Sequence, residues 1–285
     1  MSTALVLEGG GMRGIYTAGV LDVMTENDIF LPTTYAVSAG ACNALSYISK
    51  QHGRNRRIYC EYSCDKRYLS FGGYISRGSI FGFDFIFGEL AHTLIPFDYK
   101  EFFDSTMQLY AGATDCVTGK PVYFGKEDMD EAFEAVIASS SLPVVSKVVH
   151  FKDHELLDGG VSESIPLQRS IDDGNRRNVV VLTREKEYVK GSKPDFPLFL
   201  LKRKYKRYPQ LVKAITERGE KYNNERSLCF EQQEQGNAFV IMPSEPLSVG
   251  RYSTKKQELE SAYELGVKDA KACLAKLQSF LAMGG

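Results

Sequence analysis

Residues 36–40 read Ala36-Val37-Ser38-Ala39-Gly40, a serine set among very small residues. The stretch ends a short apolar run and precedes a segment of helical spacing from about Cys42 to Lys50. A serine between a strand and a helix is the layout of a nucleophile elbow, which exposes the hydroxyl group at the carboxyl end of the strand. The usual form is G-x-S-x-G, so Ala36 replaces the first glycine. This leaves a second interpretation open, an ordinary strand-to-helix turn with a capping serine.

A glycine-rich loop lies upstream of this serine, between a predicted buried strand at Thr3–Leu7 and a predicted helix that begins near Ile15. Backbone N–H groups at such a helix start bind phosphate groups or an oxyanion. Two functional interpretations compete: a dinucleotide site, because the loop matches G-x-G-x-x-G, and an oxyanion hole for acyl transfer. A third is that the loop only packs a helix on a sheet. The loop residues are Gly9, Gly10, Gly11, Met12, Arg13 and Gly14.

The predicted second strand favours the oxyanion hole. A dinucleotide fold places an acidic residue near the end of that strand, where it binds the ribose. Here Thr34–Val37 ends at Ser38, and the nearest acid, Asp28, is expected in the connecting loop. Successive strands of such a unit are usually neighbours. We therefore expect the glycine loop and Ser38 to face one bound carbonyl group.

Together with three later segments, these motifs resemble the patatin-like phospholipase family. The resemblance covers roughly residues 3–182 and keeps the motif order of the family. Glu8 stands where the family often has Asp, and Ala36 replaces a glycine, but these changes keep the charge and the small size. The matching segments are Glu8–Gly14, Ala36–Gly40, Ala113–Asp115 with Thr118–Gly119, Ala138–Pro143 and Asp158–Gly160.

The resemblance implies a three-layer α/β/α fold with a mostly parallel central sheet and additional C-terminal helices. It also implies a serine lipid acyl hydrolase with a Ser–Asp dyad, in which Ser38 attacks an ester carbonyl and Asp158 is the general base. The oxyanion donors would be the N–H groups of Gly10, Gly11 and Met12. An acyltransferase or a thioesterase would use the same dyad. The elbow and turn motif would consist of Ala36, Gly40, Gly159 and Gly160.

The histidines test this assignment independently of the family. The usual α/β-hydrolase order places a histidine last, after the serine and the acid. No histidine follows His154. A triad would need His150 or His154 with an earlier acid such as Asp98 or Asp115, and that alternative stays open, although a Ser–Asp dyad is simpler. The remaining histidines are His52 and His92.

Composition limits the partners and the location. Hydrophobic residues make up 43% and charged residues 25% of the 285 positions, which suits a packed α/β protein. The net charge of −1 gives no reason to expect nucleic-acid binding, and six cysteines without a C-x-x-C pair indicate reduced thiols. We expect a lipid or acyl-ester substrate, no cofactor and no metal.

The first residues do not resemble a signal peptide, and no apolar run approaches the ~20 residues of a membrane span. A cytoplasmic protein is expected.

For the rest of the chain, the sequence predicts domain bounds and approximate secondary structure. We expect a catalytic core over residues 1–185, extending at most to about 243, and a mostly helical part over residues 186–285 that completes or covers it. Residues 69–97, rich in aromatic side chains, would line an acyl channel, form a lid or fill the core. The basic run Lys202–Arg207 suits peripheral contact with an anionic lipid surface or a solvated helix face. Further elements are predicted as a helix at Asp128–Ala138 and strands at Val144–Phe151 and Ala238–Pro243, with one or two helices at Lys255–Met283.

Overall fold

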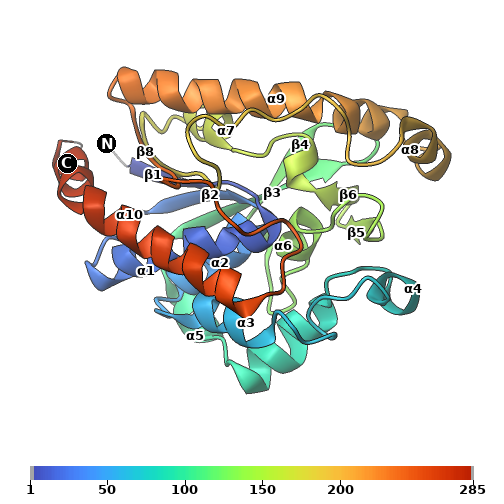
Figure 1. Ribbon diagram of the computed structural model, residues 1–285, viewed down its shortest axis with the longest axis horizontal. Coiled ribbons are helices and arrows are strands. Elements are labelled where there is room, and N and C mark those ends of the chain that lie inside the picture. Colours follow the sequence, from blue (N-terminus) through green and yellow to red (C-terminus); the bar gives the residue numbers. More distant parts are fainter. Residues whose placement is uncertain (1–2, 284–285) are drawn as a thin grey trace.

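The computed structural model describes residues 3–283, and within them five parallel strands lie side by side in one sheet in the order β3-β2-β1-β7-β8 (Figure 1). These strands are β1 (Thr3–Leu7), β2 (Thr33–Val37), β3 (Gln108–Asp115), β7 (Arg177–Val181) and β8 (Ala238–Ile241). The antiparallel strands β4 (Pro121–Gly125) and β6 (His154–Asp158) pair with β3, and β5 (Val149–Phe151) pairs with β6. The sheet is therefore mostly parallel, as predicted.

The register of the central strands brings the motif-bearing loops together. Leu7 pairs with Ala36 on one side and with Val181 on the other. The glycine loop that follows β1 and the serine that follows β2 therefore start side by side. This is the carboxyl edge of the sheet, where open α/β sheets bind their ligands.

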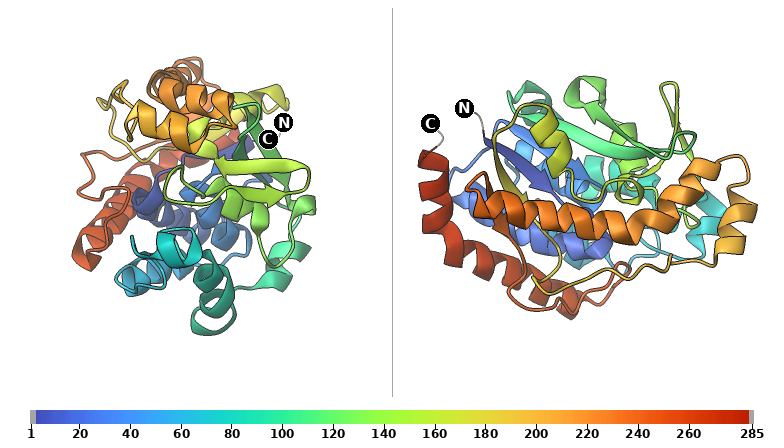
Figure 2. Two further views of the ribbon diagram at one scale, coloured as in Figure 1. Left: turned by 90° about the vertical axis from the view of Figure 1, so that its right-hand side faces the viewer. Right: turned by 90° about the horizontal axis from the view of Figure 1, so that it is seen from above.

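Helices cover both faces of the sheet, which confirms the predicted three-layer α/β/α fold (Figure 1). Alternate side chains of β1 pack against the two helix layers, since successive residues of a strand point to opposite faces. Leu5 and Leu7 pack with one layer, whereas Val6 packs with the other. The first layer contains α1 (Gly14–Glu26), α2 (Ala39–Ile48) and α10 (Lys256–Ala282), and the second contains α7 (Leu167–Asp172) and α9 (Pro209–Glu234), which crosses the sheet in Figure 2.

Helix α10 packs against α1 at unusually short range. A Cβ atom at Gly19 would lie 2.4 Å from the carbonyl oxygen of Tyr263, and one at Gly266 would lie 2.2 Å from that of Tyr16. Real Cβ atoms do not come so close to backbone oxygens, so both positions require glycine. The side chains at this contact are also linked, because Tyr263 Oη donates a hydrogen bond of 2.8 Å to Asp22 Oδ2.

Shorter helices complete the two layers and the loops between them. They are α3 (Arg54–Tyr62), α4 (Gly73–Arg77), α5 (Tyr99–Asp104), α6 (Glu134–Ser139), α8 (Leu198–Lys204) and a π-helical segment, Phe85–Leu94. None of the helices in residues 3–283 has the length and apolar character needed to cross a membrane.

Two predicted elements are wrong in extent. The helix expected at Asp128–Ala138 is a 3₁₀ turn at Lys126–Asp128 followed, after a break, by α6. The break arises because Phe133 adopts a φ of +50° and inserts its ring, 1% exposed, among other aromatic rings of the core. The strand expected at Val144–Phe151 is reduced to β5, and Val144 itself has a φ of +72°, which no strand residue adopts. The predicted β8 and the C-terminal helix are confirmed.

Candidate active site

Ser38 occupies a strained turn between β2 and α2. Its φ and ψ are +55° and −125°, a conformation that costs a non-glycine residue of order 1–3 kcal/mol. The neighbours are small for steric reasons. A Cβ atom at Gly40 would lie 2.8 Å from the carbonyl oxygen of Leu7, and one at Gly14 would lie 2.8 Å from Ala39 Cβ. The geometry is that of a nucleophile elbow, with the glycine loop packed directly against it.

Ser139 holds the main chain of this turn. Its hydroxyl accepts a 2.8 Å hydrogen bond from the Ser38 N–H and donates a 2.6 Å bond to the carbonyl oxygen of Gly112. Ser139 is fully buried. The serine-rich segment that the sequence singled out at residues 138–143 therefore contacts the elbow itself.

Asp158, the last residue of β6, meets Ser38. The Ser38 hydroxyl donates a hydrogen bond of 2.7 Å to Asp158 Oδ2, although 120 positions separate the two residues. The other carboxylate oxygen accepts from the N–H of Gly160 at 2.9 Å. Both side chains are buried, with exposed fractions of 7% and 2%. Burial raises the pKa of Asp158, against the lowering effects of the Arg218 charge, the Ser38 hydrogen bond and the Arg251 charge.

The histidines lie elsewhere. His154 Nδ1 is 2.9 Å from Asp115 Oδ2, and His150 lies 3.9 Å from Glu155. His154 begins β6 and Asp158 ends it, so along an extended strand they are about 13 Å apart. In the described part of the chain, Ser38 has a carboxylate partner and no histidine partner. This arrangement favours the dyad over the triad that the sequence left open.

The glycine loop offers fewer free amides than expected. The N–H of Met12 donates to the carbonyl oxygen of Arg251 at 3.1 Å, because the segment before α10 folds over the loop. The N–H groups of Gly10 and Gly11 have no acceptor within residues 3–283. Gly11 has a φ of +57°, and a Cβ atom there would lie 2.7 Å from the Arg251 carbonyl oxygen, so this position requires glycine. Of the three amides predicted to bind an oxyanion, two are free.

Other loop residues have packing contacts. The N–H of Gly9 donates to the carbonyl oxygen of Ser164 at 3.1 Å. Glu8, just before the loop, accepts hydrogen bonds from the N–H of Thr183 at 2.5 Å and from Tyr222 Oη at 2.8 Å, which ties the loop to the end of β7 and to α9.

The turn after β6 also requires a glycine. A Cβ atom at Gly159 would lie 2.1 Å from the carbonyl oxygen of Gly112, so β6 can end beside β3 only with glycine there.

A narrow apolar cavity opens beside Ser38. It is lined on one side by Gly11, Met12 and Ala39 and on the other by aromatic and aliphatic side chains. Part of the aromatic segment 69–97 lines this cavity, whereas Phe85 and Phe97 are buried in the core, as one of the predictions for this segment expected. The apolar lining includes Ile58, Tyr59, Tyr68, Phe81, Phe83, Ile86, Phe87 and Leu142.

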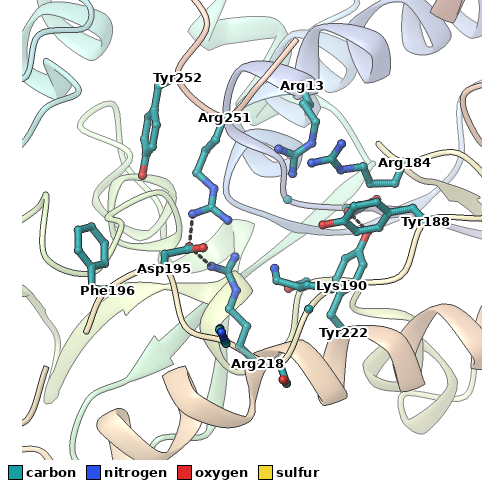
Figure 3. A pocket seen from close by; sticks show the side chains of 16 residues that line it. Arg13, Arg184, Tyr188, Lys190, Asp195, Phe196, Arg218, Tyr222, Arg251 and Tyr252 are labelled. Atoms are coloured by element: carbon teal, nitrogen blue, oxygen red, sulfur yellow. Dashed lines mark hydrogen bonds and ion pairs between the residues drawn. The ribbon is translucent and has the colours of Figure 1, made fainter. Parts of the chain in front are cut away.

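A second, larger cavity of about 720 Å³ lies on the other side of the glycine loop (Figure 3). Gly9 and Arg13 contribute to it from the loop, and Arg218 contributes from α9. Among its cations, only Arg13 belongs to a motif recognised in the sequence, the glycine loop. The signal for α9 was present, since Pro209 suits a first helical position and Leu211, Ile215, Tyr222 and Cys229 recur at helical spacing.

Similarity to known proteins extends over most of the chain. The family model described as Patatin-like phospholipase matches residues 5–170, and a model described as a domain of unknown function, DUF6363, matches residues 208–282. The uncharacterised protein YjjU of Escherichia coli K12 is 30% identical over an alignment of 189 positions, which covers 63% of this chain and 51% of YjjU. The match thus spans about half the length of that relative. VipD from Legionella pneumophila gives a TM-score of 0.49 at 13% identity, covering 96% of this chain and 67% of that chain.

The central sheet with helices on both faces defines a three-layer α/β protein, and the glycine loop and the buried serine lie at the carboxyl edge of its sheet. The chain belongs to the patatin-like phospholipase family, whose model covers more than half of it. Membership supports lipid acyl hydrolysis as the general class of activity.

Proposed function

We propose that this protein is a serine lipid acyl hydrolase, a phospholipase A or related carboxylic ester hydrolase, that uses a Ser38–Asp158 dyad. The observation that supports this most directly is the 2.7 Å hydrogen bond from Ser38 Oγ to Asp158 Oδ2 in a buried site. A serine hydroxyl is a weak nucleophile unless a base beside it accepts the proton. Asp158 is the one side chain in residues 3–283 that accepts a hydrogen bond from this hydroxyl.

The reaction would proceed in two steps. Ser38 Oγ attacks the ester carbonyl carbon while its proton passes to Asp158 Oδ2, and the protonated carboxyl then gives this proton to the leaving alcohol. In the second step Asp158 takes a proton from water, which attacks the acyl-enzyme. The bond between the acyl group and Ser38 Oγ then breaks, the fatty acid is released, and Asp158 returns the proton to Ser38 Oγ. A buried carboxylate with a raised pKa is a better base for this purpose than one in water.

The free amides of Gly10 and Gly11 would bind the oxyanion of each tetrahedral intermediate. The N–H of Ala39, the first residue of α2, is a further candidate, because Gly11, Ser38 and Ala39 line the same cavity. One such donor typically contributes about 3 kcal/mol of transition-state stabilisation. The apolar cavity beside these groups would hold the acyl chain.

Contact with a lipid surface would involve α4 and α8. These helices carry exposed apolar side chains, among them Ile75 at 91% and Phe199 at 69%. One side-chain contact joins them, since Lys204 Nζ lies 4.6 Å from the ring centre of Tyr74. Exposed apolar groups beside a basic run suit the interface of an anionic membrane, where they enter the headgroup region.

Fluorophosphonate labelling tests the nucleophile directly. We expect a fluorophosphonate probe to modify one site, Ser38, because only an activated serine attacks phosphorus at a useful rate. Peptide mapping of the labelled protein identifies the residue. Labelling should disappear in Ser38→Ala and persist in Ser227→Ala, which changes an exposed serine of α9. Modification of another serine, or no modification of the folded protein, would refute the proposal.

The pH dependence tests the base. Since Asp158 must be ionised to accept a proton, kcat/KM should fall as the pH drops through its raised pKa. The Arg218 charge lowers this pKa, so Arg218→Gln should raise it further and move the acid limb of the profile to higher pH. The measurement uses a neutral p-nitrophenyl acyl ester. Lys213→Gln, an exposed change on the same helix, serves as the control. An unmoved limb, or one moved to lower pH, contradicts the assignment.

A further inference from the structure

A small apolar cavity adjoins the one beside Ser38. Both are lined by Cys42, Ile86 and Phe87, so they share a wall. We call the small one the inner cavity; it measures about 40 Å³, and α2 and the π-helical segment contribute most of its lining. A single water molecule needs about 10–15 Å³ of such space, so a group of the size of a carboxylate fits. Among the described residues that line the inner cavity, one is charged, Arg54.

Arg54, the first residue of α3, is buried without a counter-ion. Its side chain is 8% exposed, and the ring centre of Phe97 lies 5.0 Å from its guanidinium carbon. Within residues 3–283, no carboxylate shifts its pKa or pairs with it. Burial lowers the pKa of Arg54 to about 10, so the group is still a cation near neutral pH. A buried charge of this kind is costly unless an anion joins it.

The guanidinium group also has unused donors. An arginine carries five N–H donors. Nη1 of Arg54 donates to Ser46 Oγ at 3.3 Å, and Nη2 donates to the carbonyl oxygen of Ile95 at 3.1 Å. Nε is buried and has no hydrogen-bond partner in the described structure. Buried polar groups normally have partners, so the free donor beside the inner cavity indicates a ligand that accepts hydrogen bonds.

The position of Arg54 relates the inner cavity to the reaction. Ser38 precedes α2, and Ser46, which accepts a hydrogen bond from Arg54, follows eight residues later in this helix. At 1.5 Å per residue, the cation lies about 12 Å from the elbow along the helix axis. Each C–C bond is about 1.5 Å long and advances an extended chain by somewhat less, so about ten carbons span this distance.

We propose that the acyl chain of the substrate carries a carboxylate at its far end, which binds Arg54 in the inner cavity while the ester carbonyl lies at Ser38. The ring of Phe87 turns aside in this complex, and the methylene groups of the chain fill both apolar cavities. A carboxylate accepts two hydrogen bonds side by side from a guanidinium group, which adds geometric specificity to the attraction of the charges.

The substrates of this class are esters of long dicarboxylic acids. Such chains arise when a reaction oxidises the methyl end of a fatty acid or cleaves one of its double bonds by oxidation. The inference rests on the proposed function for the position of the ester, but its binding test needs no turnover.

The test uses full-length Ser38→Ala protein and two ligands of the same chain length, monomethyl sebacate and dimethyl sebacate. The monomethyl ester has a free carboxylate at one end, whereas the dimethyl ester is neutral. Isothermal titration calorimetry should show that the monomethyl ester binds at least about tenfold more tightly, the usual effect of a charge-assisted hydrogen bond. Monomethyl succinate, whose chain is too short to reach from Ser38 to Arg54, should bind much more weakly than monomethyl sebacate.

Variants of Arg54, made in the same Ser38→Ala protein, assign the preference to this residue. Arg54→Gln should remove it, so that the two sebacate esters bind about equally. Arg54→Lys should reduce it, because the charge stays but the planar fork of donors is lost. Arg57→Gln, an exposed charge loss on the same helix, should keep the full preference.

The ratio of the two affinities is the readout, since general damage to the cavities weakens both ligands alike. Equal binding of the two esters by the Ser38→Ala protein would overturn the proposal, and so would an unchanged ratio in Arg54→Gln. Should Arg54→Gln fail to fold, Arg54→Lys takes its place: a reduced ratio supports the proposal and an unchanged ratio overturns it. Fluorophosphonate labelling of Ser38 does not depend on these results, so the two proposals fail separately.

Discussion

Asp158→Asn is expected to lower kcat for ester hydrolysis by about 10²- to 10⁴-fold while the protein stays folded. The amide has nearly the shape of the carboxylate and can still accept a hydrogen bond from Ser38, but it cannot take up the proton. The loss should therefore appear in kcat more than in KM. Steady-state kinetics with a neutral p-nitrophenyl acyl ester measure it, and circular dichroism checks the fold.

Asp115→Asn is the matched control for this variant. Asp115 is also a buried carboxylate at the end of a strand, but it pairs with His154 and Thr118 and does not contact Ser38. We expect it to keep most of the activity. Near-normal turnover by Asp158→Asn would disprove the dyad, and a large loss in Asp115→Asn alone would favour a role for the His154–Asp115 pair.

Gly266→Leu should strongly destabilise the protein, because its side chain would enter the contact between α10 and α1. A Cβ atom already meets the carbonyl oxygen of Tyr16 at 2.2 Å, and both backbones are fixed by the sheet and its core. Overpacking of a rigid contact costs about 1–3 kcal/mol and sometimes more, so the free energy of unfolding should drop by at least this amount. Urea denaturation measures the change.

Ala275→Leu on the same helix provides the comparison. Ala275 is exposed, so the added atoms meet solvent and the free energy of unfolding should change little. If Gly266→Leu unfolded at the wild-type urea concentration, α10 would not be held against α1 as closely as the structure has it.

The sequence predicts well those features of the site that depend on residues adjacent in the chain. The elbow around Ser38 requires small neighbours, and the glycine loop requires positive φ at Gly11, so both needs appear directly in the residues. The pairing of β1 with β2 also follows, because successive strands of such a unit are usually neighbours. The meeting of Ser38 with Asp158 was predicted through family resemblance, since an Asp-Gly turn alone is common.

The parts that sequence does not predict depend on contacts between distant segments. Arg184, Arg218 and Arg251 each look like an ordinary surface cation in their own stretch, and only the packing of α9 and of the segment before α10 brings them together. The blocked amide of Met12 is a main-chain contact with Arg251, and no side-chain pattern encodes it. Phe133 broke a predicted helix because its ring fits the core better than the helix surface.

The contact between Arg251 and the glycine loop has a consequence for how the cavities on the two sides of this loop communicate. The carbonyl oxygen of Arg251 accepts the hydrogen bond of the Met12 N–H, and the guanidinium group of Arg251 lines the larger cavity. A displacement of this residue that breaks the bond would free the Met12 amide on one side of the loop and move a positive charge on the other. A change in one cavity is therefore coupled to the other through one residue.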